Sequence, residues 1–272
     1  MTDQLRESGG IRRTGRSLIG SSDLPLVSVI TAVFNGQQYI VNCIESVLQQ
    51  DYPYIEYIVI DGGSSDGTID LLRQYDDRIA FWSSEPDRGV YDAWNKGLAI
   101  AQGEWICFVG ADDEFLPGAI SAYMQLAAQE PEAEYLSSRE RWVQNSGYER
   151  LKGGPWSWKT FSRWNCASHV GSMHRRSLFD RLGTYNLTFS PVADYEFLLR
   201  AGDRLRTAYM PIVTTKVRAG GMTDTRNALT EATRAKILTG RRNFLVAKAE
   251  LLFANLKYPL RPLRSAFERL IP

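Results

Sequence analysis

The chain of 272 residues has little cysteine, little histidine and no long apolar run. Its three cysteines, Cys43, Cys107 and Cys166, are odd in number and far apart, which argues against a disulfide framework. No pair of them has zinc-ligand spacing. Each lies in or near an apolar stretch, so we expect reduced thiols in the core of a cytoplasmic protein. No stretch approaches the roughly 20 apolar residues that a membrane span needs.

The chain also lacks an excess of charge of either sign. Lys plus Arg number 32 and Asp plus Glu number 31, a balance that argues against a nucleic-acid partner. Residues 1–24 contain four arginines but no apolar run, so they are unlike a secretory signal. Their Gly, Ser and Thr content predicts a flexible tail. The length fits one large domain, or one domain with a small appendage.

In the first half of the chain, β-branched runs alternate with helical patterns. The runs predict buried strands at 26–33, 55–60, 79–83 and 105–109. Helices between them predict a mostly parallel α/β sheet with right-handed crossovers. The second half is less regular. Its patterns predict helices at 118–130, 177–182, 194–201 and 227–254, a hairpin of 134–143 with 148–151, and a strand at 208–217.

Acidic residues follow three of the four predicted strands, where ligands bind in an open parallel sheet. Clustered carboxylates repel one another unless a cation offsets their charge, and oxygen ligands suit Mg²⁺ or Mn²⁺. The pattern predicts a metal-assisted site for a phosphorylated substrate. Asp and Gly are also common in turns, and for Asp66 a helix cap is the better explanation. For the adjacent pair Asp112 and Asp113, function is the better one, because neighbouring like charges suit a turn poorly.

Four segments resemble family 2 glycosyltransferases, which have the GT-A fold. Val27–Thr68 and Ser84–Pro117 are similar to their amino-terminal half, in order. Ser168–Gly202 resembles the acceptor-side half, and Gly220–Thr223 (GGMT) resembles a Gly-rich stretch that often follows. The resemblance implies a mostly parallel central sheet flanked by helices over residues 25–223. Residues 25–117 would form the nucleotide-sugar half, 118–223 the acceptor half, and 224–272 a basic helical extension.

The resemblance implies an inverting glycosyltransferase that uses Mn²⁺ or Mg²⁺. The donor would be a nucleotide-sugar, with UDP-sugars first, and the acceptor a glycan or lipid-linked glycan of a bacterial surface polysaccharide. Two other functions remain as alternatives. One is a non-catalytic scaffold that kept the fold. The other is a sugar nucleotidyltransferase, which would need a Gly-rich basic phosphate loop after the first strand, and Phe34-Asn35-Gly36 is not one.

The family's metal motif, often Asp-x-Asp-Asp, reads Gly110-Ala111-Asp112-Asp113 here, so the resemblance assigns the metal to Asp112 and Asp113. The usual Asp-Asp-Gly-Ser reads Asp61-Gly62-Gly63-Ser64, with one acid missing. The resemblance implies nucleotide-sugar contacts at Ala32, Phe34, Asn35, Asp61, Asp87, Arg88, Asp112 and His169. Among these, Phe34 would stack on the base, Arg88 would pair with phosphate, and His169 would touch the diphosphate or metal, or else be structural.

Asp194 matches the family's catalytic base, which takes the proton of the acceptor hydroxyl. It also starts a helical pattern, so it could cap a helix as well. We expect the second histidine, His174, to lie in a surface strand. Three tryptophans gather at Trp156, Trp158 and Trp164, as an acceptor platform or as a satellite of the core.

From Arg226 to the end, ten basic and three acidic residues interleave with apolar ones. Such a segment can lie on an anionic membrane surface from the cytoplasmic side. The alternative is a helix packed on the domain or on a second copy in a homodimer. Pro259 and Pro262 favour this alternative, because they interrupt a long amphipathic face.

Overall fold

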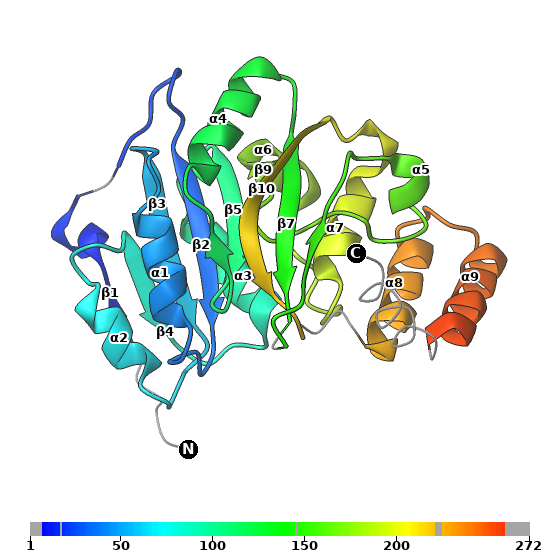
Figure 1. Ribbon diagram of the computed structural model, residues 1–272, viewed down its shortest axis with the longest axis horizontal. Coiled ribbons are helices and arrows are strands. Elements are labelled where there is room, and N and C mark those ends of the chain that lie inside the picture. The colour runs from blue at the N-terminus through cyan, green and yellow to red at the C-terminus, as the bar shows by residue number, and fades with distance from the viewer. Residues whose placement is uncertain (1–6, 17, 145, 221–224, 259–272) are drawn as a thin grey trace.

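The computed structural model describes residues 7–16, 18–144, 146–220 and 225–258. A ten-stranded sheet runs through it in the order β1-β4-β3-β2-β5-β9-β7-β10-β6, with β8 paired to β7 (Figure 1). The strands are β1 (Glu7–Gly9), β2 (Val27–Val33), β3 (Ile55–Asp61), β4 (Phe81–Ser84), β5 (Trp105–Gly110), β6 (Glu114–Phe115), β7 (Tyr135–Val143), β8 (Glu149–Lys152), β9 (Met173–Arg175) and β10 (Thr207–Arg218).

Helices cover both faces of this sheet. The α-helices are α1 (Ile40–Leu48), α2 (Thr68–Gln74), α3 (Val90–Ile100), α4 (Ala119–Gln129), α5 (Trp158–Phe161), α6 (Arg176–Leu182), α7 (Ala193–Ala201), α8 (Arg226–Leu238) and α9 (Phe244–Lys257). Two short 3₁₀ helices are η1 (Ile11–Thr14) and η2 (Gly202–Arg204). Within the described ranges, no helix is long and apolar enough to cross a membrane.

The alternation of side chains along the strands builds two cores. Val27 and Val29 of β2 point to one face, where they pack with buried residues of α1, α2 and α4. Ile30 points to the other face, where it packs with α3, α6, α7 and α8. The chain is therefore a three-layer α/β structure. Strands β4, β3, β2 and β5 are parallel, as the alternating pattern predicts, while β1, β9 and β6 pair antiparallel to their neighbours.

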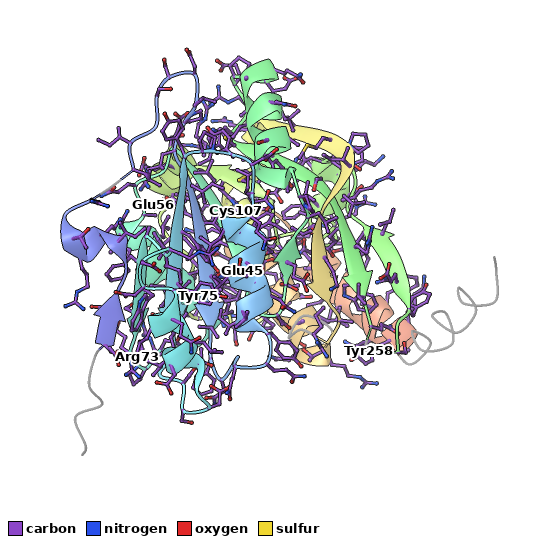
Figure 2. The ribbon with its side chains drawn as sticks, turned by 60° about the vertical axis from the view of Figure 1, so that its left-hand side comes forward. Glu45, Glu56, Arg73, Tyr75, Cys107 and Tyr258 are labelled. Atoms are coloured by element: carbon purple, nitrogen blue, oxygen red, sulfur yellow. The ribbon has the colours of Figure 1, made fainter. Side chains whose placement is uncertain are left out.

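The prediction of a flexible tail over residues 1–24 is wrong for residues 7–14. Strand β1 pairs with β4 at the sheet edge, and η1 follows it. Two ion pairs hold this segment, one from Arg73 of α2 to Glu7 at 2.7 Å and one from Arg12 to the buried Glu56 (Figure 2). Glycine and serine favour flexibility locally, but sheet pairing and charge contacts with distant residues outweigh it.

Three further expectations need correction. The helical pattern at 227–254 is two helices, since Gly240 adopts a positive φ of 67° and Asn243 begins α9 by accepting the N–H of Leu245. His174 is not at the surface but fully buried in β9. Cys166 is exposed, whereas Cys43 and Cys107 are buried as expected. The predicted hairpin of 134–143 with 148–151 is confirmed as β7 and β8.

Candidate active site

The carboxyl ends of four parallel strands lie at one edge of the sheet. Asp61 at the end of β3 is level with Val33 of β2 and with Ser84 of β4, and Gly110 of β5 is level with Ala32. The loops that follow these strands therefore begin side by side. This is the arrangement that the sequence predicts for the acidic loops, and Ala32, Phe34 and Asn35 start from the same edge.

Asp61 is fully buried and its contacts are internal. Its Oδ2 accepts the N–H groups of Gly63 and Ser64, at 3.0 and 2.9 Å, and the hydroxyl of Ser84 at 2.6 Å. Its Oδ1 accepts the hydroxyl of Ser64. In this structure Asp61 therefore fixes the loop after β3, and its direct contact with a nucleotide stays a prediction.

Asn35 connects the first two loops. Its N–H donates to Ser64 Oγ at 2.7 Å, and its Oδ1 accepts the N–H of Ser65 at 2.9 Å. It is the one described non-glycine residue with a positive φ, 49°, a conformation that Asn tolerates well. Its neighbour Phe34 is 65 % exposed, an unusual position for a phenyl ring in a folded chain. Phe34 is thus free to stack on a ligand, as the resemblance implies.

The two adjacent carboxylates converge on Gly110. A Cβ on residue 110 would lie 2.9 Å from Asp113 Oδ2 and 3.1 Å from Asp112 Oδ1. Gly110 replaces the first acid of the motif, and the space without a side chain there is occupied by the carboxylates of Asp112 and Asp113. Asp113 is buried, and its Oδ1 accepts the N–H of Arg218 at 2.9 Å. Burial, reinforced by the charge of Asp112, raises the pKa of Asp113 well above its ordinary value.

These residues fit a divalent cation that also binds a substrate phosphate. Two carboxylates with oxygen atoms over one glycine are the partial ligand set that Mg²⁺ or Mn²⁺ takes when phosphates and water complete it. Within the described part of the chain, no group of three or more His, Cys, Asp or Glu side chains gathers for a metal. Among the described residues, the protein thus supplies only part of the coordination shell of a metal ion.

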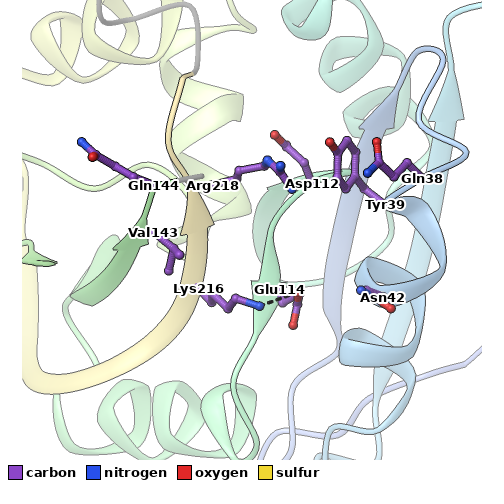
Figure 3. A pocket seen from close by; sticks show the side chains of 9 residues that line it. All are labelled: Gln38, Tyr39, Asn42, Asp112, Glu114, Val143, Gln144, Lys216 and Arg218. Carbon is purple, nitrogen blue, oxygen red and sulfur yellow. Dashed lines mark hydrogen bonds and ion pairs between the residues drawn. The ribbon is translucent and has the colours of Figure 1, made fainter. Parts of the chain in front are cut away.

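A pocket of about 410 Å³ adjoins Asp112 (Figure 3). Tyr39, the N-cap residue of α1, lines it from one side, and the end of β10 supplies Lys216 and Arg218. The Arg218 guanidinium lies 4.4 Å from the centre of the Tyr39 ring, and Lys216 pairs with Glu114 at 3.0 Å. These two cations were missed by the sequence analysis. The signal was available, because they directly precede the Gly-rich stretch 220–223, most of which lies outside the described residues.

A larger cleft of about 1,030 Å³ contains Asp112, Asp113, His169 and Asp194. Residues far apart in the sequence meet here because the carboxyl end of β5, the segment before β9 and the amino end of α7 all line the cleft. Asp194 lies in the first turn of α7, whose N-cap is Val192, so the expected capping role is wrong. Its Oδ1 accepts the hydroxyl of the buried Tyr91 at 2.8 Å.

His169 sits in the wall of this cleft among aromatic rings. Its ring centre is 4.9 Å from that of Trp94 and 5.6 Å from that of Phe108, with the second pair stacked. Burial lowers the pKa of His169, so the imidazole is neutral at physiological pH. Its Nε2 is 3.5 Å from Tyr185 Oη, while the buried Nδ1 has no hydrogen-bond partner among the described residues.

Asp87 and Arg88 lie outside the larger cleft. Asp87 is half-buried and accepts the N–H of Gly89 at 2.8 Å, while Arg88 is 74 % exposed and pairs with Asp92. Of the three tryptophans, Trp164 lines the cleft, but Trp156 and Trp158 pack half-buried against the core. The platform hypothesis thus applies to Trp164, and the core-satellite hypothesis to the other two.

Comparison with known proteins gives concordant results. The model of "Glycosyl transferase family 2" matches residues 28–183. An uncharacterized glycosyltransferase of Mycobacterium tuberculosis is 37 % identical over 183 residues, covering 65 % of this chain and 69 % of the relative. A "PGL/p-HBAD biosynthesis glycosyltransferase" of the same species is 30 % identical over 215 residues, covering 74 % and 80 %.

Solved structures agree in fold. TarS 1-349 of S. aureus in complex with UDP-GlcNAc superposes with a TM-score of 0.63 at 17 % identity, covering 87 % of this chain and 73 % of that one. The mannosyltransferase PcManGT of Pyrobaculum calidifontis, in complex with GDP-Man and Mn²⁺, gives 0.59 at 18 % identity, covering 95 % and 85 %.

Proposed function

Because the chain belongs to glycosyl transferase family 2 and has the GT-A fold, we propose that it transfers a sugar, with inversion, from a UDP-sugar to a hydroxyl of a glycan or lipid-linked glycan. Glycosyl transfer follows from the family. The base of the donor nucleotide, the acceptor and the catalytic and binding residues are what we propose. One observation carries it above all. The carboxylates that converge on Gly110 and the carboxylate of Asp194 open into the same cleft.

The donor diphosphate binds beside Asp112 and Asp113. Asp112 and Asp113 would hold a divalent cation, which would supply Lewis-acid stabilisation of the leaving diphosphate. Lys216 and Arg218 line the neighbouring pocket and would complement the same negative charge. Phe34, Asn35 and the loops after β3 and β4 lie along the sheet edge, where they would hold the nucleoside.

Asp194 acts as the general base. A carboxylate within reach of the acceptor hydroxyl accepts its proton as the oxygen attacks the anomeric carbon, so no covalent enzyme intermediate is required. Tyr91 Oη donates to Asp194 Oδ1, which leaves Oδ2 for the acceptor. The neutral imidazole of His169 lines the same cleft, with its Nδ1 buried and without a hydrogen-bond partner among the described residues.

The far part of the cleft suits an acceptor with an apolar portion. Helices α8 and α9 line it with Leu229, Ala232, Leu251 and Ala254. A bare glycan would gain little from these side chains, whereas a lipid or aryl carrier would bury apolar area against them. This wall supports a lipid-linked acceptor.

Helix α9 presents a second apolar face, directed away from the domain. Its inner face buries Ala247 and directs Glu250 to α8. Five of its exposed apolar side chains are spaced one, three, four or seven residues apart, which places them on one side of the helix. They are Leu245 (75 % exposed), Val246 (44 %), Leu252 (64 %), Phe253 (52 %) and Leu256 (68 %).

We propose that this face of α9 rests on an anionic membrane surface at the cytoplasmic side. Lys248 and Lys257 flank the apolar residues, and the one acidic residue of α9, Glu250, is turned inward. Apolar side chains between lysines are the pattern of a helix that lies in the interface of an anionic bilayer. Figure 1 shows α8 and α9 together at the end of the molecule opposite β1, so the other described elements leave the outer side of α9 accessible.

Thermal unfolding tests the donor site. UDP, GDP, dTDP and CMP are each added with and without Mn²⁺, to the protein and to Asp113→Asn. A ligand at 100 times its dissociation constant adds about 2.7 kcal/mol, or roughly 5–11 °C for a chain of this size. We expect a metal-dependent shift with UDP that Asp113→Asn loses. No shift with any nucleotide would favour the non-catalytic scaffold, one of the two alternatives.

Flotation with vesicles tests the membrane contact. We expect binding to phosphatidylglycerol-containing vesicles that is weaker on pure phosphatidylcholine and is lost in Leu252→Asn/Leu256→Asn. Ile212→Asn, at a 44 % exposed position on β10, is the matched control. Concentration-dependent dimers that the same double variant abolishes, without vesicle binding by the parent protein, would instead identify a second copy as the partner of α9.

A further inference from the structure

Asp87 occupies the space that a side chain on residue 62 would need. A Cβ at Gly62 would lie 2.7 Å from Asp87 Oδ2 and 3.1 Å from its Cγ. The adjacent Gly63 has a φ of 86°, and a Cβ there would lie 3.4 Å from the backbone nitrogen of Pro86. The loop after β3 therefore has glycine at the two positions, 62 and 63, that face the loop after β4. Without side chains there, the two loops can approach closely.

The carboxylate of Asp87 is only partly used by the protein. Its Oδ1 accepts the N–H of Gly89, whereas its Oδ2 lies over Gly62 and accepts no hydrogen bond from the described residues. Asp61, by contrast, is fully buried with both oxygens engaged. Asp87 is only half-buried, and its Oδ2 is available to accept a hydrogen bond from a ligand, unlike the oxygens of Asp61.

Burial, together with the charges of Asp92 and Asp61, raises the pKa of Asp87 above its ordinary value, and the hydrogen bond from Gly89 and the charge of Lys96 offset this only in part. A hydrogen-bond donor from a ligand would relieve that unfavourable burial of charge. A carboxylate accepts from an N–H and repels a ring nitrogen that carries a lone pair. The imide N–H of uracil meets this requirement, while the equivalent ring nitrogen of cytosine does not.

We propose that Asp87 selects the nucleobase of the donor by accepting the imide N–H of uracil, and that Gly62 makes this possible by leaving room for its carboxylate. The acid absent from position 62 is thereby replaced by one from the next loop of the sheet. This inference rests on the proposed nucleotide-sugar site and deepens it, because it assigns base selection to one residue pair.

The test compares UDP, CDP and pyrophosphate, each with Mn²⁺, by calorimetric titration. Pyrophosphate carries no base, so it reports on the metal and phosphate contacts alone. The proteins are the parent, Asp87→Asn, Gly62→Ala, and Asp77→Asn as a control at an exposed position. We expect the parent to bind UDP at least tenfold more tightly than CDP, since a hydrogen bond to a charged group contributes about 1.5–3 kcal/mol.

In Asp87→Asn and Gly62→Ala the affinity for UDP should fall about 10- to 150-fold, and the preference over CDP should disappear. The affinity for pyrophosphate should stay within threefold, as should every affinity of Asp77→Asn. Unchanged UDP affinity in Asp87→Asn would overturn this inference while the proposed function stands, and so would an equal loss for UDP and pyrophosphate. A parent protein that binds neither UDP nor CDP would overturn both this inference and the UDP-sugar donor of the proposed function.

Discussion

The carboxylate of Glu250 carries the ion pairs that tie α9 to Lys236 of α8 and to Arg242. Glu250 lies between Lys236 Nζ at 3.3 Å and the guanidinium of Arg242, with Lys236 only 4 % exposed. Lys236 also donates to the carbonyl of Arg163 at 2.6 Å. Glu250→Gln keeps the shape of the side chain but leaves the buried ammonium of Lys236 without its counter-charge.

The expected loss follows from this geometry. Removing one partner of a fully buried ion pair costs about 3–5 kcal/mol. Glu250 is 16 % exposed and Lys236 keeps its bond to Arg163, so we expect about 2 kcal/mol. For a chain of this size that lowers the unfolding midpoint by roughly 4–8 °C at pH 7. If the substitution detaches only α9 and the rest of the domain stays folded, the lost stability should appear as faster hydrogen exchange confined to residues 244–257.

The effect has a defined pH dependence. Burial raises the pKa of Glu250, but the hydrogen bond from Arg242 and the charge of Lys236 outweigh it, so the pKa lies below its ordinary value. A carboxyl with a lowered folded-state pKa stabilises the fold above its unfolded pKa, about 4.3, and loses that contribution as the pH falls through the folded value. The difference between parent and Glu250→Gln should therefore be full at pH 7 and shrink below pH 4.

Glu130→Gln is the matched control, at an exposed position after α4. Calorimetry and hydrogen exchange at pH 7 and pH 3.5 are the measurements. Equal midpoints and equal exchange for Glu250→Gln and Glu130→Gln at pH 7 would refute the reasoning. A deficit as large at pH 3.5 as at pH 7 would refute it too, because it would show that shape rather than charge carries the contact.

Asp194→Asn should lower kcat about 10²- to 10⁴-fold in a steady-state transfer assay, with donor affinity by calorimetry unchanged. Tyr91→Phe should lower kcat about tenfold without changing the donor KM, since the lost hydrogen bond only positions Asp194. A thiol reagent should modify one cysteine of the native chain, Cys166, and all three after denaturation. Arg12→Met should lower the unfolding midpoint by at least about 4 °C in calorimetry, because it leaves Glu56 buried at 2 % exposure without its cation.

The parallel strands were predictable because their signal is local. Buried β-branched runs such as 26–33 and 105–109 alternate with helical periods, and the structure has strands and helices there. The positions of Asp112 and Asp113 followed from the same signal, since they come directly after a buried strand. Strand β1 was not predictable, because its three residues have no periodicity and pair only through contacts with β4.

Burial escaped prediction wherever it depends on distant packing. His174 looked exposed because Arg175 and Arg176 follow it, yet it is enclosed by aromatic rings from other elements. Asp61 looked like a ligand contact, and its sequence neighbours gave no sign that Ser84 would engage it. Lys216 and Arg218 were passed over although the Gly-rich stretch 220–223 follows them, because their own strand pattern does not show that they lie beside Asp112.

The amino-acid sequence by itself determined the family, the parallel core of the sheet and the acids that follow its strands, because periodicity and turn composition act over a few residues. The tertiary structure decided which of these groups meet. It brings Tyr91 to Asp194 across 103 positions and the N–H of Arg218 to Asp113 across 105. It also sets Asp87 over Gly62. Such contacts depend on the packing of helices and strands against one another, and no local pattern encodes them.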